Sequence, residues 1–400
     1  MRESAGIPGG KRRSIAAWFA AIGILAVPVV QAQVKNEALV SSQSDLIDSE
    51  YSQSRATIAW CDAAGGLWIA GIDRDTGMFV PSDGKGLLVD PSAMRIDDLK
   101  VVGNGPEWVS TADGDQIVYT KFPPDQPHSM QNAKLALAEQ SGSGDWSYHY
   151  LLPLDRRGGP YASHDPGDPS PRISYFDSNG RHYWRDLNDP SSETPLPMPR
   201  SRLSTRFVEG TRAVVFTALV AGTSQVFFHW LDTGTTSQVT FDPGDKDLHT
   251  VPWSWKAPEF GGDLVIATVV DDTELRIYRQ SPATGWSLVQ SMRTPLQGVI
   301  NSPEPFVHAG KSFMVFSAST PPGTQPTAVF MARIDPAAPL LWQLTPDLPR
   351  RIRRDPEVFV TSSGPYVYFN RLTFGGGGTY CVPCNEGVFR SYTGLPPAAK

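Results

Sequence analysis

A glutamate follows a proline at four points along the 400-residue chain. The four pairs lie near the starts of short β-rich segments, and their glutamates are Glu107, Glu259, Glu304 and Glu357. General acid and base catalysis on a glycosidic bond needs two positioned carboxyl groups, and a ring of carboxylates can bind a cation or sugar hydroxyls. A repeated residue also has a structural interpretation, in which proline fixes a turn and glutamate caps a neighbouring backbone amide. Both interpretations are open at this point.

Aromatic residues in the same segments are the candidate ligand contacts. Trp108 lies in one of the proline–glutamate segments, and Trp253 and Trp255 are two residues apart, which places both indoles on one face of a strand. His308 joins them because it follows one of the glutamates by four residues. An exposed indole can stack on a sugar or another flat ligand, whereas a buried indole fills the core between sheets. Most of the 11 tryptophans must have the second role.

Motifs for metals and cofactors are missing from the sequence. The seven histidines are scattered, and none has a zinc-site spacing such as His-Glu-x-x-His. No Gly-x-Ser-x-Gly elbow is present, which excludes an ordinary α/β-hydrolase. We therefore predict no metal and no cofactor.

The chain has three cysteines, Cys61, Cys381 and Cys384. An oxidising compartment permits disulfides, and an odd number leaves at least one thiol free or paired between chains. Cys381 and Cys384 have the spacing of a redox motif, but they lie in a Gly-rich segment and not at the start of a helix, where a thiol of low pKa is expected. We predict a structural bridge, either between these two or from Cys61 to one of them.

The first 32 residues have the layout of a secretory signal peptide. Three basic residues at 11–13 precede an almost uncharged run at 14–30, and Ala32 ends the small-residue pattern before a cleavage site. The run is slightly short for a transmembrane helix, which needs about 20 residues. We therefore predict cleavage after Ala32, a periplasmic or secreted protein, and no transmembrane segment after signal removal.

The mature chain has an acidic charge balance. Removal of residues 1–32 takes away four basic residues and one acidic residue, which leaves 31 basic and 40 acidic residues and a net charge near −9. Nucleic acid is excluded as a partner on this ground, because its phosphates attract Lys and Arg. The partner stays unassigned between an unknown ligand and an envelope protein.

The mature chain repeats a pattern of short strands. A strong apolar strand recurs in the segments 56–62, 115–122, 171–177, 212–218, 263–270, 311–318 and 365–372. An aromatic strand follows each of them, and Asp/Gly turns that are typical of hairpins follow most of the aromatic strands. The repeats start near residues 50, 106, 160, 206, 258, 303 and 356, so each is about 50 residues long. Repeats of this length with four short strands are typical of β-propeller blades.

We therefore predict an all-β fold, a single β-propeller over residues 51–396 with seven blades of four-stranded antiparallel sheets, or six blades as the alternative. Each blade covers its two apolar faces only by packing between neighbours. The last repeat lacks a clear fourth strand. Residues 33–50 are expected to be a flexible lead-in, in which a strand at Ala38–Ser41 could complete that blade and close the ring. The first strand of each blade lines the central channel, so the four glutamates are predicted to form an acidic ring there.

The repeats resemble those of TolB-like propellers. The segment 105–120 carries the resemblance through its Pro-x-aromatic start, its Gly/Asp turn and its apolar strand, together with the strand ends Gln238-Val-Thr240 and Gln343-Leu-Thr345. The family's usual Ser-Pro-Asp-Gly is absent in its full form. The resemblance implies the propeller fold, and such propellers serve as binding scaffolds, protease accessory domains and enzymes.

Two functions follow from these features. The first is an exported binding protein or scaffold that recognises a small molecule, a glycan or a protein partner at one mouth of the ring. The alternative is a carbohydrate-active glycoside hydrolase or lyase that uses the channel carboxylates. An open channel with two close, non-equivalent carboxylates and a stacked tryptophan would favour the hydrolase, and a filled channel would favour the scaffold.

Overall fold

The computed structural model describes twelve stretches of the chain. They are residues 35–112, 114–151, 156–165, 170–189, 191–200, 205–242, 248–282, 285–295, 298–319, 325–348, 350–374 and 381–398. The predicted signal peptide, residues 1–32, lies outside them.

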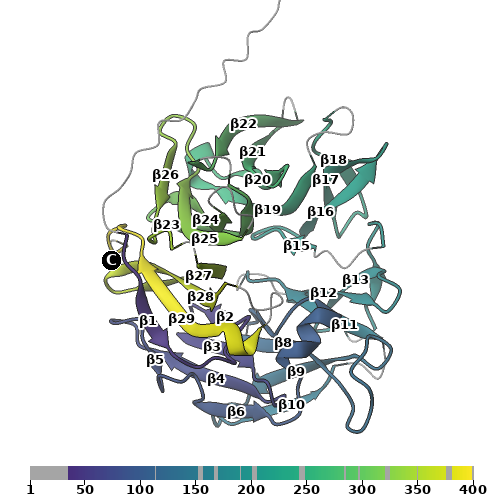
Figure 1. Ribbon diagram of the computed structural model, residues 1–400. Coiled ribbons are helices and arrows are strands. Elements are labelled where there is room, and N and C mark those ends of the chain that lie inside the picture. Colours follow the sequence, from purple (N-terminus) through teal and green to yellow (C-terminus); the bar gives the residue numbers. More distant parts are fainter. Residues whose placement is uncertain are drawn as a thin grey trace, which may run out of the picture.

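Seven antiparallel sheets surround a common centre, which confirms the predicted seven-bladed β-propeller (Figure 1). From the innermost strand outward, blade 1 contains β2 (Glu50–Ser52), β3 (Thr57–Cys61), β4 (Leu67–Ile72), and the two short strands β5 (Phe79–Val80) and β6 (Leu87–Asp90), which both pair with β4. Blade 2 contains β7 (Glu107–Val109), β8 (Gln116–Lys121), β9 (Lys134–Gln140) and β10 (Trp146–Tyr150). Blade 3 contains β11 (Arg157–Ala162), β12 (Arg172–Asp177), β13 (His182–Asp186) and β14 (Thr194–Pro195).

The second half of the chain continues the pattern. Blade 4 contains β15 (Arg206–Phe207), β16 (Ala213–Val220), β17 (Thr223–Trp230) and β18 (Thr236–Gln238). Blade 5 contains β19 (His249–Ala257), β20 (Asp263–Val270), β21 (Glu274–Ser281) and β22 (Gly285–Arg293). Blade 6 contains β23 (Ile300–His308), β24 (Lys311–Ser319), β25 (Pro326–Arg333) and β26 (Leu340–Gln343). Blade 7 contains β27 (Arg351–Thr361), β28 (Gly364–Thr373), β29 (Asn385–Tyr392) and, from the other end of the chain, β1 (Ala38–Ser41).

Helical turns in the described stretches are short. A 3-10 turn, η1 (Ile96–Asp98), and α1 (Leu99–Val102) connect blade 1 to blade 2. The turns η2 (Pro258–Phe260) and η4 (Val382–Cys384) lie within blades 5 and 7. None of these helical elements is long and apolar enough to cross a membrane.

The apolar core is divided among the gaps between the blades. Seven clusters of buried apolar side chains each join one pair of neighbouring blades, including blades 7 and 1. Trp60 of blade 1 and Tyr368 of blade 7, for example, are completely buried in the same cluster. Burial of apolar surface contributes roughly 25 cal/mol per Å², so a blade gains this stabilisation only when both neighbours are in place.

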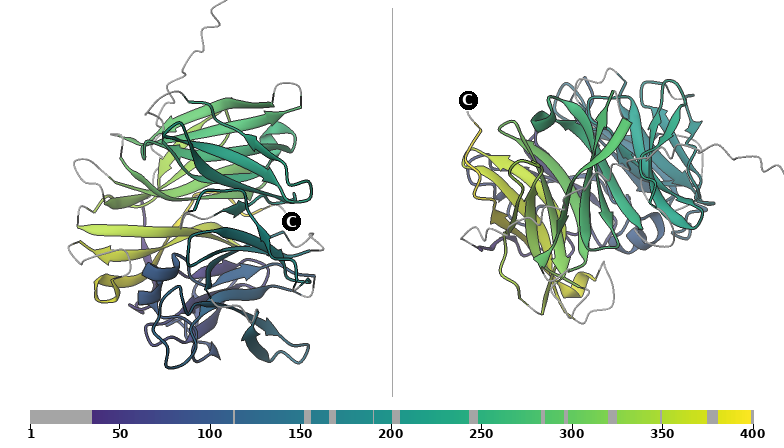
Figure 2. Two further views of the ribbon diagram at one scale, coloured as in Figure 1. Left: turned by 90° about the vertical axis from the view of Figure 1, so that its right-hand side faces the viewer. Right: turned by 90° about the horizontal axis from the view of Figure 1, so that it is seen from above.

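The N-terminal strand closes the ring. β1 pairs with β29 in antiparallel register, and the first (purple) and last (yellow) segments lie together in all views (Figures 1 and 2). Glu37, just before β1, accepts hydrogen bonds from Arg353 and Arg371 of blade 7 at 2.5 Å each. The Arg353 side chain is fully buried and Glu37 is only 6% exposed. A buried ion pair therefore holds the N-terminal strand in the last blade.

The lead-in between β1 and β2 is packed against the ring. Leu46 is completely buried and Ile47 is 3% exposed. The Leu46 carbonyl accepts a hydrogen bond from Asn370 of β28 at 2.7 Å. Burial of these two large aliphatic side chains holds the lead-in against the ring, although its polar composition predicts a flexible segment.

The disulfide joins neighbouring cysteines. Cys381 and Cys384 are bridged at η4, where they pack against Ile352 and Leu372. Cys61 is a buried free thiol, and burial raises its pKa above the ordinary value, so it is unreactive. Of the two connectivities that the sequence leaves open, the structure contains the local one, and the bridge from Cys61 does not form.

Replacement of Glu37 tests ring closure. We expect Glu37→Ala to lower the free energy of unfolding by roughly 3–5 kcal/mol, because it leaves the buried Arg353 guanidinium without its counter-charge. The measurement is urea unfolding followed by tryptophan fluorescence. Lys35→Ala is the control, since Lys35 reaches Gln343 at an exposed position and its loss should cost less than about 0.5 kcal/mol. Equal stability of the two variants would show that the ion pair does not hold the ring closed.

Candidate functional site

Each innermost strand has one residue at an equivalent position. At this position the residue pairs with the second strand of its blade. In four blades a β-bulge precedes this residue. The bulge residue has a positive φ and is followed by proline, as in Val251-Pro252-Trp253 and Ser302-Pro303-Glu304, where φ is 44° at both Val251 and Ser302. A bulge re-aims the side chain that follows it. A positive φ is unusual for a β-branched residue, so strain at Val251 is the cost of this orientation.

These seven residues form what we call the channel ring, and all of them line one central cavity of about 590 Å³. In order around the ring they are Glu50, Glu107, Tyr161, Arg206, Trp253, Glu304 and Glu357. Other cavity-lining residues precede the innermost strands, such as Asp48 and Asn104, or follow them, such as His164 and Glu209. The side chains of the described residues therefore leave the channel open as a cavity.

Three adjacent blades contribute an aromatic arc, defined as Tyr161, Arg206 and Trp253. The guanidinium carbon of Arg206 lies 4.3 Å from the ring centre of Tyr161 and 4.6 Å from that of Trp253. A guanidinium held between two aromatic faces is stabilised by cation–π interactions, the more so where water is scarce. Burial opposes the charge of Arg206, but Tyr161 and the nearby carboxylates outweigh burial and raise its pKa.

The other four blades contribute an acidic arc, defined as Glu304, Glu357, Glu50 and Glu107. Burial holds the pKa values of Glu304, Glu357 and Glu50 well above their ordinary range, and the facing carboxylates add to the shift. Arg206 acts against each shift without cancelling it. Glu304, Glu357 and Glu50 therefore retain their protons to a higher pH than exposed glutamates do.

Two aspartates extend the acidic arc. Asp48 and Asp355 are left-handed residues, with φ of 58° and 50°, that stand two positions before Glu50 and Glu357. Burial raises the pKa of Asp48 to about 7, helped by the charges of Asp355 and Glu107. Burial also raises the pKa of Asp355, although Arg354 and a hydrogen bond from Ser302 oppose the change. Asp165 and Glu209 also line the cavity, so eight carboxyl groups share it with Arg172 and Arg206.

Glu107 has a different environment from the other members of the acidic arc. Asn104 donates a hydrogen bond to it at 2.6 Å, and its other oxygen lies 3.5 Å from Nε2 of His164. Burial disfavours a charged His164, but the interaction with Glu107 and the charge of Glu209 outweigh burial and raise the histidine pKa. The ring therefore contains non-equivalent carboxyl groups. No three His, Cys, Asp or Glu side chains among the described residues converge as the ligands of one metal ion.

Glu259 is a correction to the predicted acidic ring. It lies in η2 and accepts hydrogen bonds from the backbone amide and the hydroxyl of Ser312 in blade 6, the latter at 2.8 Å. The innermost strand of blade 5 begins at His249, not near residue 258, so the residue at the ring position is Trp253. Glu259 has the capping role that the structural interpretation describes, because its proline starts a turn between strands.

The four aromatic candidates are separated by the fold. Trp253 belongs to the channel ring, and Trp255 reaches the cavity wall but is only 4% exposed and donates to Ser312 at 3.0 Å. Trp108 is buried between blades 1 and 2, where its indole donates to the Glu50 carbonyl at 3.1 Å. His308 is buried, contacts the carbonyl of Pro396 at 2.7 Å, and does not itself line the cavity.

Four members of the channel ring do not belong to a proline–glutamate pair: Glu50, Tyr161, Arg206 and Trp253. Tyr161 and Trp253 do follow proline, so a search for x-Pro-x in the innermost strand, whatever the third residue, would have found both. Glu50 and Arg206 follow Ser49 and Thr205, and nothing local distinguishes them from other polar residues.

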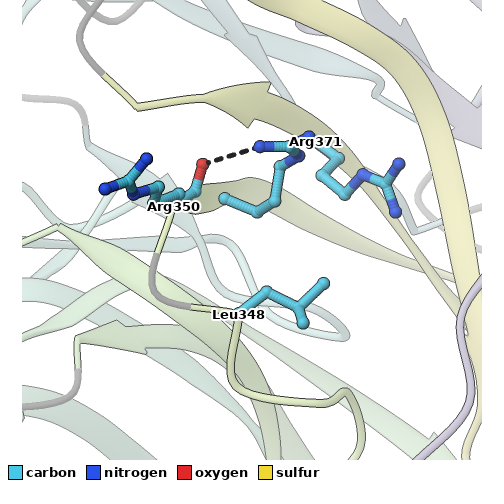
Figure 3. A pocket seen from close by; sticks show the side chains of 4 residues that line it. Leu348, Arg350 and Arg371 are labelled. Carbon is cyan, nitrogen blue, oxygen red and sulfur yellow. Dashed lines mark hydrogen bonds between the residues drawn. The ribbon is translucent and has the colours of Figure 1, made fainter.

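Two further hollows lie outside the channel. One, of about 530 Å³, is lined by Leu348, Arg350, Arg351 and Arg371 (Figure 3). Arg351 and Arg371 are already paired with Glu386, at 2.7 and 2.5 Å, so the hollow does not present three free cations to an anion.

The other hollow, of about 500 Å³, lies between blades 2 and 3. Glu139 and His149 line it 3.9 Å apart. Neither hollow gathers charged side chains from as many blades as the channel, so the channel is the candidate site.

Comparison with known proteins relates this chain to others by fold. No model of a known protein family matches it, and no curated protein sequence matches it. An ancestral GH74 enzyme shares 12% identity at a TM-score of 0.51, over 92% of this chain and 49% of that one. TolB from Acinetobacter baumannii (16% identity, TM-score 0.38, 85% of this chain and 79% of that one) also matches. A Dyadobacter fermentans protein of unknown function matches as well, with 11% identity and a TM-score of 0.43, over 72% of this chain and 93% of that one. The propeller fits the loose TolB-like resemblance, and identities this low indicate fold and not activity.

The raised carboxyl pKa values predict a pH-dependent effect of Glu357→Gln. A pKa that is higher in the folded than in the unfolded protein makes stability fall as pH rises from the unfolded value, about 4.3, through the folded one. The side-chain amide of glutamine stays uncharged, so the variant does not lose stability in this way as the pH rises. Relative to the native protein, we expect the Tm of Glu357→Gln to be higher at pH 8 and nearly unchanged at pH 4.5.

Scanning calorimetry at both pH values measures the effect. Glu259→Gln is the matched control, because it removes the same charge from outside the cavity. It should lower Tm at both pH values through its weakened contacts with Ser312. A Glu357→Gln variant that is destabilised equally at pH 4.5 and pH 8 would contradict the protonated acidic arc.

Proposed function

We propose that this chain is an exported binding protein that holds a small polar ligand in its central channel. The observation that carries the proposal is the channel ring, in which seven blades direct four glutamates, an arginine, a tyrosine and a tryptophan into one cavity of about 590 Å³. Ligand pockets in proteins measure about 300–1,000 Å³ and combine apolar walls with a few converging polar groups. Export rests on the signal-peptide layout of residues 1–32.

The wall of the cavity offers hydrogen-bonding atoms that the described residues do not use. Oδ2 of Asp48, Nε of Arg206 and Nε1 of Trp253 are buried and have no hydrogen-bond partner there. An unsatisfied buried polar atom costs roughly 1–3 kcal/mol. A ligand whose binding shifts these side chains so that the atoms become paired would recover part of that cost, which supports a binding role over a purely structural one.

A second candidate function is hydrolysis or elimination at a glycosidic bond. Conditions that favour the hydrolase are met, because the channel is open, Trp253 lines it, and its carboxyl groups are not equivalent: Glu107 contacts His164, whereas Glu304 faces Arg206 and the other carboxyl groups. Glycosidases need one protonated carboxyl as general acid and one ionised carboxylate as base or nucleophile. Glu304 or Glu357 would supply the proton, and Glu107 would take the second role.

A ligand screen separates the two functions. We expect ligands of the native protein, drawn from glycans, polysaccharides and small charged molecules, to raise its Tm. Glu304→Gln and Trp253→Ala should weaken binding roughly tenfold or more through lost charge-assisted and aromatic contacts. Glu259→Gln, outside the cavity, should bind like the native protein.

Release of reducing ends in the same screen identifies the hydrolase. Turnover that Glu304→Gln abolishes would establish that function, and binding without turnover would retire it. Ligands that bind all variants equally would contradict the channel as the site.

The exported form should begin at Gln33. Cleavage after Ala32 follows from the small-residue pattern at the end of the apolar run. Intact-mass analysis of protein recovered from the periplasm or the medium measures the new N-terminus. A mature chain that still contains residues 14–30 would contradict the cleaved signal peptide and favour a membrane anchor.

A further inference from the structure

The charge distribution around the channel ring restricts what the cavity can hold. The acidic arc occupies four consecutive blades, and the aromatic arc occupies the other three. Asp48 and Asp355 stand on the acidic side, and Asp165 and Glu209 also line the cavity, so eight carboxyl groups share it with the guanidinium groups of Arg172 and Arg206 and with His164. A neutral ligand leaves the repulsion among these groups in place, and an anionic ligand would add to it. A cation is the one charge type that relieves it.

We propose that the ligand is a small organic cation, an amine or a guanidinium compound, which binds to the acidic arc in exchange for protons. The inference deepens the proposed function and rests on the channel as the binding site. Each carboxyl that contacts the cation loses its proton, which passes to the solvent, so no covalent bond to the ligand forms or breaks.

The geometry favours an organic cation over a metal ion. Metal ligands must surround one point, and no three acidic or histidine side chains of the described residues do so. The carboxyl groups are instead distributed over four blades, which suits a ligand with separated nitrogen atoms or a broad guanidinium group. Arg206 shows the same chemistry inside the protein, because its guanidinium sits between Tyr161 and Trp253 while facing Glu304.

The unpaired wall atoms support a bound molecule. Oδ2 of Asp48, buried and without a partner among the described residues, can accept a hydrogen bond from an ammonium group. Arg206 stands opposite and repels a second cation, which confines the ligand to the acidic side of the cavity.

The groups that control proton exchange come from every wall of the cavity. Glu304 faces Arg206, Glu50, Glu107 and Asp355. Glu357 faces Arg206, Glu107, Asp355 and Glu304. His164 and Glu209 interact with each other near Glu107 and set the charge at that end of the acidic arc. A bound cation favours the ionised carboxylates, so it lowers their pKa values and binding must release protons.

Calorimetric titration tests the proposal with spermidine, agmatine and glucosamine as cationic probes. The comparison ligands are Ca²⁺ and the neutral trisaccharides maltotriose and cellotriose. Titrations in two buffers of different ionisation enthalpy, at pH 6, 7 and 8, measure the protons released. We expect at least one cationic probe to bind with proton release and to gain about tenfold in affinity per pH unit for each proton released.

Variants identify the site of binding. Glu304→Gln and Glu357→Gln should weaken binding of the cation roughly tenfold or more and reduce the number of protons released. Glu259→Gln should leave both quantities unchanged. Circular dichroism and Tm values confirm that each variant is folded, so a loss of affinity is not a loss of structure.

Three outcomes would overturn the inference. Binding of a neutral trisaccharide, but of no cationic probe, with the same dependence on Glu304 would reject the cation and leave the channel as the binding site. Binding of Ca²⁺ alone would replace the organic cation by a metal. Cation binding that is insensitive to both channel variants, or that releases no protons, would reject the acidic arc as the site and weaken the proposed function with it.

Discussion

Each four-stranded sheet of this protein has two apolar faces, and neither can be left in water. A flat stack of such sheets would expose one face at each end, whereas a closed ring exposes none. The seven interblade clusters, including the one that joins blades 7 and 1, show that burial is continuous around the ring. Closure depends on β1 and on the buried pairing of Glu37 with Arg353, because without them blade 7 would present an incomplete sheet.

Closure has a consequence for electrostatics. Once seven innermost strands surround one axis, residues that are about 50 positions apart in sequence become neighbours, and any charge repeated from blade to blade meets its copies. The four glutamates of the acidic arc meet Arg206 in this way, and Asp48 and Asp355 line the same cavity. The protein tolerates the arrangement by keeping part of the acidic arc protonated and by surrounding Arg206 with aromatic rings. A cluster of buried carboxyl groups of this kind costs folding stability.

The repeated glutamates fall into two groups by their position in the fold. Glu259 stabilises a contact between blades 5 and 6 through Ser312 and lies outside the channel. Glu107, Glu304 and Glu357 line the cavity, together with Glu50. The same dipeptide therefore has two positions, and the difference lies in whether its proline leads into or lies inside the innermost strand, as at Glu107 and Glu304, or begins the turn after that strand, as at Glu259.

Strand pattern and turn chemistry in the sequence predicted the blades and left their number at seven or six, because alternation, β-branched runs and Asp/Gly turns are local properties. They also pointed to three of the channel carboxylates. The pairing of β1 with β29 in the folded ring decided for seven blades. Only the tertiary structure decided the full membership of the channel ring. Successive residues of a strand point to opposite faces, so a shift of one residue, or one bulge such as that at Val251, moves a side chain from a blade interface into the channel. Glu50 and Arg206 became part of the site through ring closure alone, since contact between distant blades leaves no mark on the residues beside them.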